Sequence, residues 1–508
     1  MEHDSNIDPL KELVRKIDPI FHPRSIAVIG ATKNLGKWGA FMVVDLLAGG
    51  FKGPIYPIHP TDKEIFTLPS FASVADVPGP IDLAFITLPA AKVPGAIKSC
   101  IAKGIKGIVL ITSGFSETGK EGKRLEAETM RLVREGGIRL VGPNTMGIIS
   151  SHAGLYATGA PVHTPEGTIS FIAQSGNLGT QMLYWAEEQG IGIGKFIGSG
   201  NEGDLTSADY LDYLGEDPET SVILLYMEGV NDGRRFLEAA SRAATKKPVV
   251  VLKSGRTEAG GHAAKSHTGS LAGKRQVFEG AFNQAGVVQA DNPSELLDLA
   301  TAFSYLPIPK GNRVGILTLG GGWGVVTSDQ CMENGLTLPS LPENIIAEMD
   351  KLLPPFWSRG NPVDLVGQFK PDIICRALEI MAESDQFDSI IALGIMGGAD
   401  FVARITKMAG PFDPTLDKEA VKAMQGLLVT EEWNIMKETV RLMKKYGKPI
   451  LVVSLATQMR TALPLGNGQT AVIFQTPEKA AKVVSKLFEY NRHTERRAVD
   501  HAFSRGSR

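Results

Sequence analysis

The sequence predicts an α/β protein built on doubly wound parallel sheets. Short apolar runs that end in glycine, proline or a polar residue alternate with helix-like segments along most of the chain. Several runs lead directly into a glycine-rich turn and then a helix, and part of this pattern repeats further along the chain. In such sheets, ligands bind at the carboxyl ends of the strands.

Composition places the chain among ordinary globular proteins. Its 508 residues are enough for about three domains. With 53 basic and 55 acidic residues, the charge balance argues against nucleic acid or an anionic membrane as partner. Three widely spaced cysteines without a CxxC pattern argue against a disulfide framework or a zinc site, and we expect no metal ligands. We expect neither a signal peptide nor a membrane span, and we expect a cytoplasmic location.

The first module begins with an apolar strand at residues 24–30, a glycine-rich turn and a helical run at 40–48. This unit can bind phosphate, because backbone N–H groups at the helix start meet an anion. The glycines fall at positions 30, 36 and 39, so the GxGxxG fingerprint of NAD enzymes is absent. Further strands are predicted at 54–60, 82–89 and 107–113. The pattern predicts a nucleotide ligand without identifying it.

The second and third modules resemble each other. Residues 168–179 and 314–324 both lead from an apolar strand into a helix, and their glycines match at one constant offset: Gly176, Gly179 and Gly190 against Gly321, Gly324 and Gly335. One copy could simply permit a tight turn, but two matched copies favour a shared anion. A helix N-terminus contributes about 0.3–2 kcal/mol toward binding an anion.

A second matched pair of strands, 221–229 and 389–397, lies at a longer offset and predicts an insertion in the third module. Glu228 ends the first of these strands where its counterpart is Met396. A carboxylate there could accept the Nδ1 proton of a histidine and leave Nε2 nucleophilic. A simple salt bridge is the alternative.

Residues 260–273 form a small-residue loop that carries His262 and His267 between a strand ending in Lys253 and a helix from residue 274. A histidine on a mobile loop suits transfer of a phosphoryl group between sites, because imidazole is nucleophilic near neutral pH. The alternative is a solvated loop without chemical function.

These motifs together resemble the α subunits of NDP-forming acyl-CoA synthetases, the succinyl-CoA synthetase superfamily, and the ADP-forming acetate–CoA ligase branch in particular. The similarity covers residues 20–490 and is carried by segments 25–31, 141–147, 174–177, 228–229, 266–269 and 320–324. It implies a Rossmann-like CoA-binding domain followed by two flavodoxin-like ligase domains. The implied boundaries are an N-terminal extension at 1–20, domains at 21–150, 151–307 and 308–490, and a frayed tail at 491–508.

The resemblance also implies roles for individual residues. His267 would be phosphorylated and Glu228 would orient it, while His262 is the weaker candidate. Phosphate would be held by Ser175, Gly176, Asn177, Gly320, Gly321, Gly322 and Gly324. CoA would be bound by Gly30, Ala31, Thr32, Lys33, Asn34, Gly36, Lys37, Pro60, Leu88, Pro89, Ser113, Gly114, Phe115 and Asn144.

Enzymes of this superfamily also need an ATP-grasp unit, and no segment of this chain accounts for one. We therefore expect a separate ATP-grasp β subunit that binds ADP or ATP with magnesium, in an α2β2 assembly. The expected activity interconverts acyl-CoA, ADP and phosphate with carboxylate, CoA and ATP, through acyl phosphate and phosphohistidine. The alternative is a CoA-binding regulatory or sensor protein without turnover. An NAD-dependent dehydrogenase is disfavoured by the glycine spacing. The acyl group is not readable from the sequence.

Overall fold

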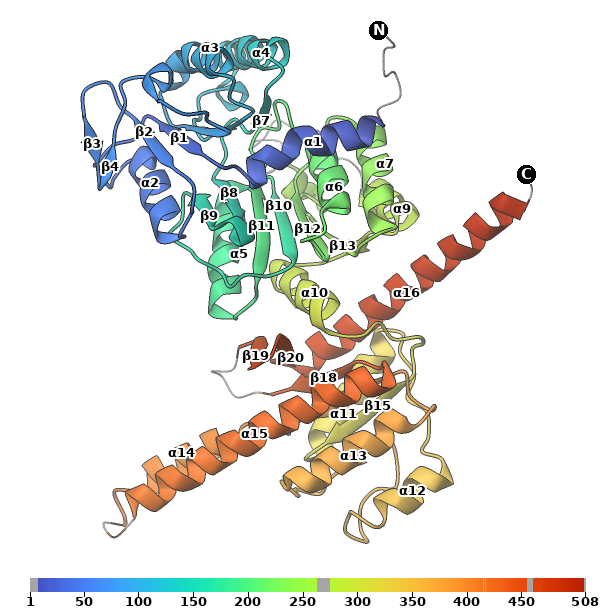
Figure 1. Ribbon diagram of the computed structural model, residues 1–508. Coiled ribbons are helices and arrows are strands. Elements are labelled where there is room, and N and C mark those ends of the chain that lie inside the picture. The colour runs from blue at the N-terminus through green and yellow to red at the C-terminus, as the bar shows by residue number, and fades with distance from the viewer. Residues whose placement is uncertain (1–7, 263–274, 414, 416, 455–459, 507–508) are drawn as a thin grey trace. The chain divides into compact units, whose positions relative to one another are not determined.

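The computed structural model describes residues 8–262, 275–413, 415, 417–454 and 460–506 (Figure 1). The chain divides into two compact units, Met1–Leu296 and Leu297–Arg508. Both contain doubly wound α/β sheets, so the predicted fold class is confirmed. Among the described residues, no helix has the length and apolar character that a bilayer span requires. The finer division into three domains with the boundaries given above stays a prediction.

The first sheet of the first unit has five parallel strands in the order β2-β1-β5-β6-β7. Because β1 lies between β2 and β5, the chain winds outward in both directions from β1, and this reversal creates a crevice at the carboxyl ends. The strands are β1 (Ile26–Ile29), β2 (Ile55–Ile58), β5 (Leu83–Ile86), β6 (Gly107–Leu110) and β7 (Arg139–Val141), with a small hairpin of β3 (Glu64–Ile65) and β4 (Leu68–Pro69). The helices are α2 (Trp38–Ala48), α3 (Val93–Lys103) and α4 (Lys120–Glu135).

The second sheet of this unit has seven strands in the order β14-β13-β12-β10-β11-β8-β9. Its parallel part comprises β10 (Ile169–Ala173), β11 (Ile193–Gly198), β12 (Val222–Met227), β13 (Val249–Lys253) and β14 (Val288–Gln289). The antiparallel pair β8 (Gly147–Ser150) and β9 (Leu155–Thr158) extends one edge. Its helices are α5 (Gly176–Glu188), α6 (Ser207–Glu216), α7 (Gly233–Ala244) and α9 (Arg275–Ala285), and α10 (Pro293–Tyr305) follows.

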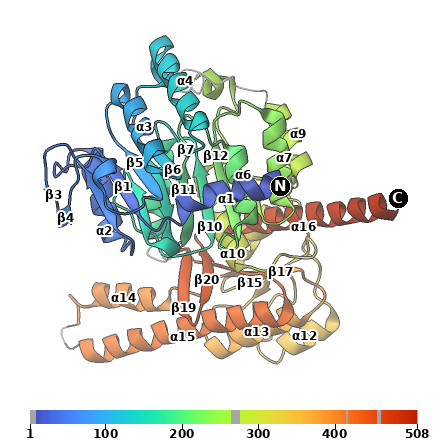
Figure 2. The ribbon, with the colours of Figure 1, turned by 45° about the horizontal axis from the view of Figure 1, so that its top comes forward.

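Helix α1 (Pro9–Phe21) covers part of this unit, where the sequence predicts only an extension (Figures 1 and 2). It buries Ile17, Ile20 and Phe21, and the Phe21 ring stacks on Tyr213 of α6 with centroids 5.2 Å apart. These residues belong to one hydrophobic core that continues from the five-stranded into the seven-stranded sheet. The two sheets therefore fold as one unit.

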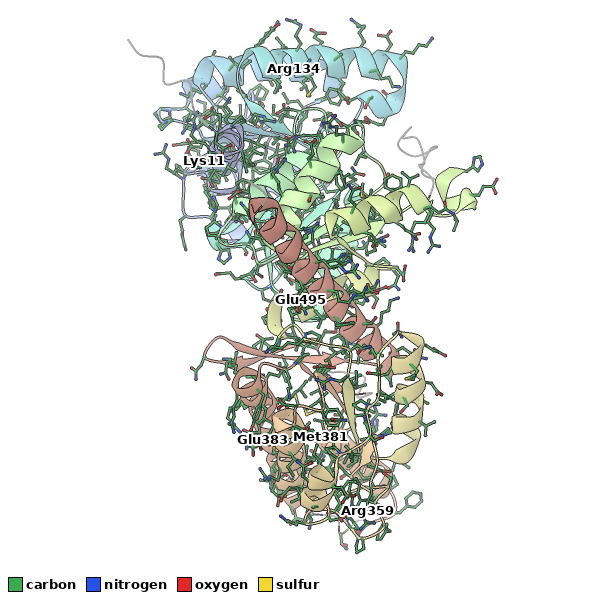
Figure 3. All side chains as sticks on the ribbon, turned by 90° about the vertical axis from the view of Figure 1, so that its right-hand side faces the viewer. Lys11, Arg134, Arg359, Met381, Glu383 and Glu495 are labelled. Atoms are coloured by element: carbon green, nitrogen blue, oxygen red, sulfur yellow. The ribbon has the colours of Figure 1, made fainter. Side chains whose placement is uncertain are left out.

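The second unit has a six-stranded sheet in the order β16-β15-β17-β18-β20-β19, in which only β19 is antiparallel to its neighbour. The strands are β15 (Val314–Thr318), β16 (Val363–Asp364), β17 (Ser389–Leu393), β18 (Ile450–Val453), β19 (Ala462–Gly466) and β20 (Gln469–Phe474). The helices are α11 (Gly321–Glu333), α12 (Glu343–Met349), α13 (Pro371–Glu383), α14 (Gly398–Ala409), α15 (Lys418–Tyr446) and α16 (Pro477–Gly506). Met381 of α13 is buried, whereas Glu383 at the helix end is exposed (Figure 3).

The carboxyl-terminal segment differs from the predicted frayed tail, because α16 continues to Gly506. Its first half is anchored by buried Ala480, Val484 and Leu487. Further along, Asn491 donates a side-chain hydrogen bond of 3.0 Å to Glu495, one turn away (Figure 3). The Arg- and Glu-rich sequence lacks apolar periodicity, but these residues favour helix on their own.

Candidate functional site

The strongest candidate site lies at the carboxyl ends of β10, β12 and β13, which are neighbours in the sheet. Ala173 pairs with Tyr226 and Met227 pairs with Lys253, so the residues that follow these strands come together. Ser175 precedes α5 after the first strand, and Glu228 directly follows the second. Parallel pairing therefore brings the predicted phosphate-binding turn and the predicted orienting carboxylate to one edge.

Gln174 joins these two segments. Its Oε1 accepts the backbone N–H groups of Glu228 (2.6 Å) and Gly229 (3.2 Å), and its Nε2 donates to the Gly229 carbonyl (2.9 Å). Both the oxygen and the NH2 group of the amide thus hold the backbone that carries Glu228. A side chain in the turn before α5 consequently fixes the start of the loop after β12.

Glu202 supports Gln174 from the other side. Its Oε1 accepts from Gln174 Nε2 (3.0 Å) and from the hydroxyls of Ser199 (2.9 Å) and Ser207 (2.5 Å). Loss of hydration raises the pKa of the Glu202 carboxyl, although these donors lower it in part. Glu202 also has a φ of 53°, which a non-glycine residue adopts only when its surroundings hold it there.

The side chain of Glu228 is buried beside Tyr226 and Lys253. Tyr226 donates its hydroxyl to Glu228 Oε1 at 3.4 Å, and burial raises the pKa of that phenol. Lys253 Nζ donates to the Glu228 carbonyl at 2.8 Å and lies 4.6 Å from the centre of the Phe278 ring. Burial lowers the pKa of Lys253, while the Glu228 charge raises it. A carboxylate with one fixed hydroxyl and a nearby cation is suited to orient a base.

Helices α5 and α11 begin at Gly176 and Gly321, as the glycine repeat predicts. Within the described part of the chain, no side chain caps either helix start, so the first N–H groups can serve as donors to an anion. Gly176 also has a packing role, since a Cβ there would lie 2.2 Å from Met146 Cγ. In contrast, a Cβ at Gly320 or Gly322 would have no described atom within 4 Å. Packing within the described residues therefore does not require glycine at positions 320 and 322, whereas a Cβ at Gly324 would lie 3.0 Å from Pro362 Cβ.

The predicted CoA loop lies at the crevice between β1 and β5. Gly30 has a φ of 93°, and a Cβ there would lie 2.7 Å from Thr87 Oγ1. A Cβ on Gly39 would lie 2.0 Å from the Gly30 carbonyl oxygen, so α2 packs directly on the turn. Between them, Asn34 Oδ1 accepts the Gly36 N–H at 2.9 Å. These glycines allow the turn and α2 to approach each other closely at the carboxyl ends of the strands.

The structure brings most of the remaining predicted CoA residues to the same edge. Leu88 follows β5, and its carbonyl accepts the Thr112 hydroxyl at 2.6 Å. Phe115 is an exception: its ring is fully buried in the core, so only its backbone can face a ligand.

A polar chain joins the Gly114 turn to Asn144. Asn144 donates to Asn201 (3.2 Å), which donates to Glu117 (2.7 Å). Glu117 in turn accepts the Gly114 N–H at 2.6 Å, and its pKa is lowered by these donors against the effect of burial.

His267 lies outside the described residues, in the segment 263–274, so its predicted role stays a prediction. His262 lies at the edge of the described part and is exposed. Among the described residues, no group of three or more His, Cys, Asp or Glu side chains could hold a metal ion. Sequence reasoning missed the supporting residues Gln174, Glu202 and Tyr226. Gln174 lies inside a quoted motif, but nothing in the sequence reveals that its partner is 54 positions away.

Comparison with protein families gives three matches in the order of the sheets. Residues 24–151 match a CoA binding domain, residues 166–303 a succinyl-CoA ligase like flavodoxin domain, and residues 314–397 a Ligase-CoA domain.

Two curated relatives come from Pyrococcus furiosus. The chain is 42% identical over 380 residues to the α subunit of acetate–CoA ligase [ADP-forming] II, covering 75% of this chain and 82% of the relative. It is 35% identical over 483 residues to the α subunit of acetate–CoA ligase [ADP-forming] I, covering 94% and 98%. Two further ADP-forming acetate–CoA ligases, named without a subunit label, are only about half spanned, at 54% and 49% of their length.

A solved structure of an acetyl-coenzyme A synthetase is also similar to this chain. The dinucleotide-forming acetyl-coenzyme A synthetase 1 of Ca. Korarchaeum cryptofilum, in complex with phosphate and ADP, aligns with a TM-score of 0.79 and 34% identity. The alignment covers 94% of this chain and 97% of that chain.

Proposed function

The chain belongs to the family of α subunits of ADP-forming acetate–CoA ligases, and on this premise we propose its reaction and the residues that carry it. It is an acid–thiol ligase subunit that interconverts acyl-CoA, ADP and phosphate with carboxylate, CoA and ATP. CoA and phosphate are its substrates. Glu228, held at the edge of β10, β12 and β13 by Gln174, is the observation that supports the proposal most directly.

In the first step, an oxygen of inorganic phosphate attacks the thioester carbonyl, and CoA leaves as its thiol. The phosphate is held by the N–H groups at the start of α5 (Ser175, Gly176, Asn177). The start of α11 in the second unit (Gly320, Gly321, Gly322, Gly324) offers N–H donors of the same kind. Their partial positive charge stabilises the charge that develops on the phosphoryl oxygens.

In the second step, Nε2 of His267 attacks the phosphorus of the acyl phosphate, and the carboxylate leaves. Glu228 accepts the Nδ1 proton and keeps Nε2 nucleophilic. The phosphoryl group then passes to ADP, which regenerates the histidine and forms ATP. Each displacement is easier than one step with three substrates.

We further propose that ADP binds with magnesium on a separate ATP-grasp β subunit in an α2β2 assembly. The subunit label of the relatives supports a separate partner, as does the half-length match to the undivided ligases. Loop 30–39 and Pro60, Leu88, Pro89, Ser113, Gly114 and Asn144 would bind CoA. A CoA sensor without turnover is the second candidate function, and the same experiment separates the two.

The test uses the full chain with its partner subunit, labelled ATP and magnesium. The wild-type chain should gain a phosphate that is labile in acid and stable in base, as phosphohistidine is. His267→Ala should abolish the label and acyl-CoA synthesis, while His262→Ala, the matched control, should keep both. Glu228→Gln should slow labelling by about 10²–10⁴. Acyl-CoA synthesis that survives in His267→Ala refutes the phosphohistidine route, and CoA binding without any label supports the sensor.

A further inference from the structure

Lys253, the last residue of β13, is a buried lysine beside Glu228. Its Nζ donates to the Glu228 carbonyl at 2.8 Å and to the Ser254 carbonyl, and it lies 4.6 Å from the centre of the Phe278 ring on α9. An ammonium has three donors and no acceptor, and carbonyl oxygens and ring faces both favour its charged form. This geometry places a cation at the end of β13, directly beside the strand end that carries Glu228 (Figure 1).

The two related modules differ at the position of Lys253. Both β13 and β18 follow a Lys-Pro pair, and alignment on these pairs matches Lys253 with Ser454. In the same modules, Glu228 is matched with Met396. The module that has the strand-end carboxylate also has the buried cation, and the other module has uncharged residues at both positions. The two charges are therefore paired in the sequence repeat as well as in the structure.

The lysines that begin these two strands behave differently. Lys247 Nζ donates to two backbone carbonyls at the end of α6, and Lys448 Nζ donates to two backbone carbonyls at the end of α13. Both are partly buried, and burial lowers the pKa of each. A lysine that joins backbone carbonyls at the strand start is thus present in both modules. Lys253 is specific to the module with Glu228, so tying carbonyls together does not account for it.

The described groups around Glu228 show what its charge contributes. Tyr226 of β12 donates its hydroxyl to the carboxylate at 3.4 Å, and Gln174 accepts the backbone N–H, with the Glu202 carboxyl behind it. Of these groups and Lys253, only Lys253 carries a positive charge. Burial lowers the pKa of Lys253, while the Glu228 charge raises it, so each charge of the pair favours the other. A buried carboxylate is costly to ionise without such a partner.

We propose that Lys253 is a positioning residue for phosphoryl transfer, and that its ammonium keeps Glu228 ionised and in place to accept the Nδ1 proton of His267. The inference rests on the proposed function and extends it. The bond from Nζ to the carbonyl fixes the backbone of Glu228, and the positive charge favours its carboxylate form. A protonated Glu228 would no longer favour the histidine tautomer with a nucleophilic Nε2.

The test follows phosphorylation of the full chain from pH 5 to pH 8, with its partner subunit, labelled ATP and magnesium. Lys253→Met keeps the apolar stem and removes the charge. The acid limb of its labelling rate should move to higher pH by about one pH unit or more, because a carboxyl that loses a nearby cation binds its proton more tightly. Lys253→Arg keeps the charge, and its acid limb should stay at the wild-type pH even when the maximal rate falls. Lys247→Met is the matched control and should not move the limb.

Urea unfolding of the full chain alone gives a second measurement that requires no phosphorylation. In folded Lys253→Met, Glu228 should retain a proton that the unfolded chain releases above a pH of about 4.3. The stability of this variant relative to the wild type should therefore fall as pH rises from 5 to 8. In a Glu228→Gln background, the same Lys253→Met exchange should have no pH-dependent effect, because the titrating carboxyl is gone.

An acid limb that does not move in Lys253→Met, or that moves equally in Lys253→Arg, would overturn the inference. So would a pH-dependent loss of stability that persists in the Glu228→Gln background. A wild type without label would refute the proposed reaction, and the role of Lys253 in it would fall with that reaction. The unfolding measurement would then still show whether Lys253 keeps Glu228 charged, so the two failures are distinguishable.

Discussion

Exchanging Gln174 for glutamate tests how Glu228 is held. In Gln174→Glu the retained oxygen can still accept the N–H groups of Glu228 and Gly229. The Nε2 donor to Glu202 (3.0 Å) and to the Gly229 carbonyl (2.9 Å) is lost, and two carboxyl groups face each other at 3.0 Å. Two carboxylates this close cannot both ionise, so one keeps its proton in the folded state.

The cost follows from the proton that the folded state must retain. Holding a carboxyl with an ordinary pKa of about 4.3 protonated at pH 7 costs about 4 kcal/mol, at 1.36 kcal/mol per pH unit. The folded variant binds one more proton than the unfolded chain, so its stability falls as pH rises above about 4.3. At pH 5 the cost should be only about 1 kcal/mol. The pKa of Glu202 is already raised in the wild type, which favours Glu202 as the protonated partner.

Urea unfolding followed by circular dichroism at pH 5 and pH 8 measures this difference against the wild type. The swap Gln174→Glu/Glu202→Gln restores an amide facing a carboxylate, and it should recover most of the stability and remove the added pH dependence. Two results would refute the proposed role of Gln174 in holding the Glu228 segment. One is a Gln174→Glu chain whose stability does not depend on pH, and the other is a double exchange that recovers none of the lost stability. Labelling of His267 should follow the same order, because loss of the Nε2 hydrogen bonds to Glu202 and to the Gly229 carbonyl loosens the segment that carries Glu228.

Two further predictions concern other parts of the first unit. Gly30→Val places a side chain on a backbone with a φ of 93° and against Thr87. It should raise the CoA dissociation constant, measured by calorimetry, at least about tenfold. Gly95→Ala is the control: its added Cβ would meet no described atom within 4 Å, and the CoA dissociation constant should not change. Burial raises the pKa of Asp45 to about 6, although the Thr158 N–H at 3.0 Å and His163 at 3.4 Å lower it in part. The folded chain therefore keeps a proton on Asp45 that the unfolded chain releases, and the free energy of unfolding falls as pH rises from about 4 through 6. Asp45→Asn should therefore stabilise the chain by about 2–3 kcal/mol at pH 8 and by little at pH 4, and equal unfolding midpoints at pH 8 would contradict this.

The sequence by itself determined the fold class, the glycine-opened helix starts and the family, because these depend on local features. Apolar periodicity and turn glycines act over a few residues, so the starts of α5 at Gly176 and α11 at Gly321 could be predicted. The identity of Glu228 as a candidate also came from its place at the end of an apolar strand.

Only the tertiary structure decided what holds that candidate in place and which surfaces lack a cover. The partner of Gln174 depends on the register of β10 against β12, and the burial of Phe21 on α1 depends on its contact with Tyr213 of α6. On α14, Phe401, Ile405 and Met408 have the spacing of a core-facing helix stripe, yet these side chains are exposed. Exposure is a property of the folded arrangement, because it depends on whether another element lies against that face.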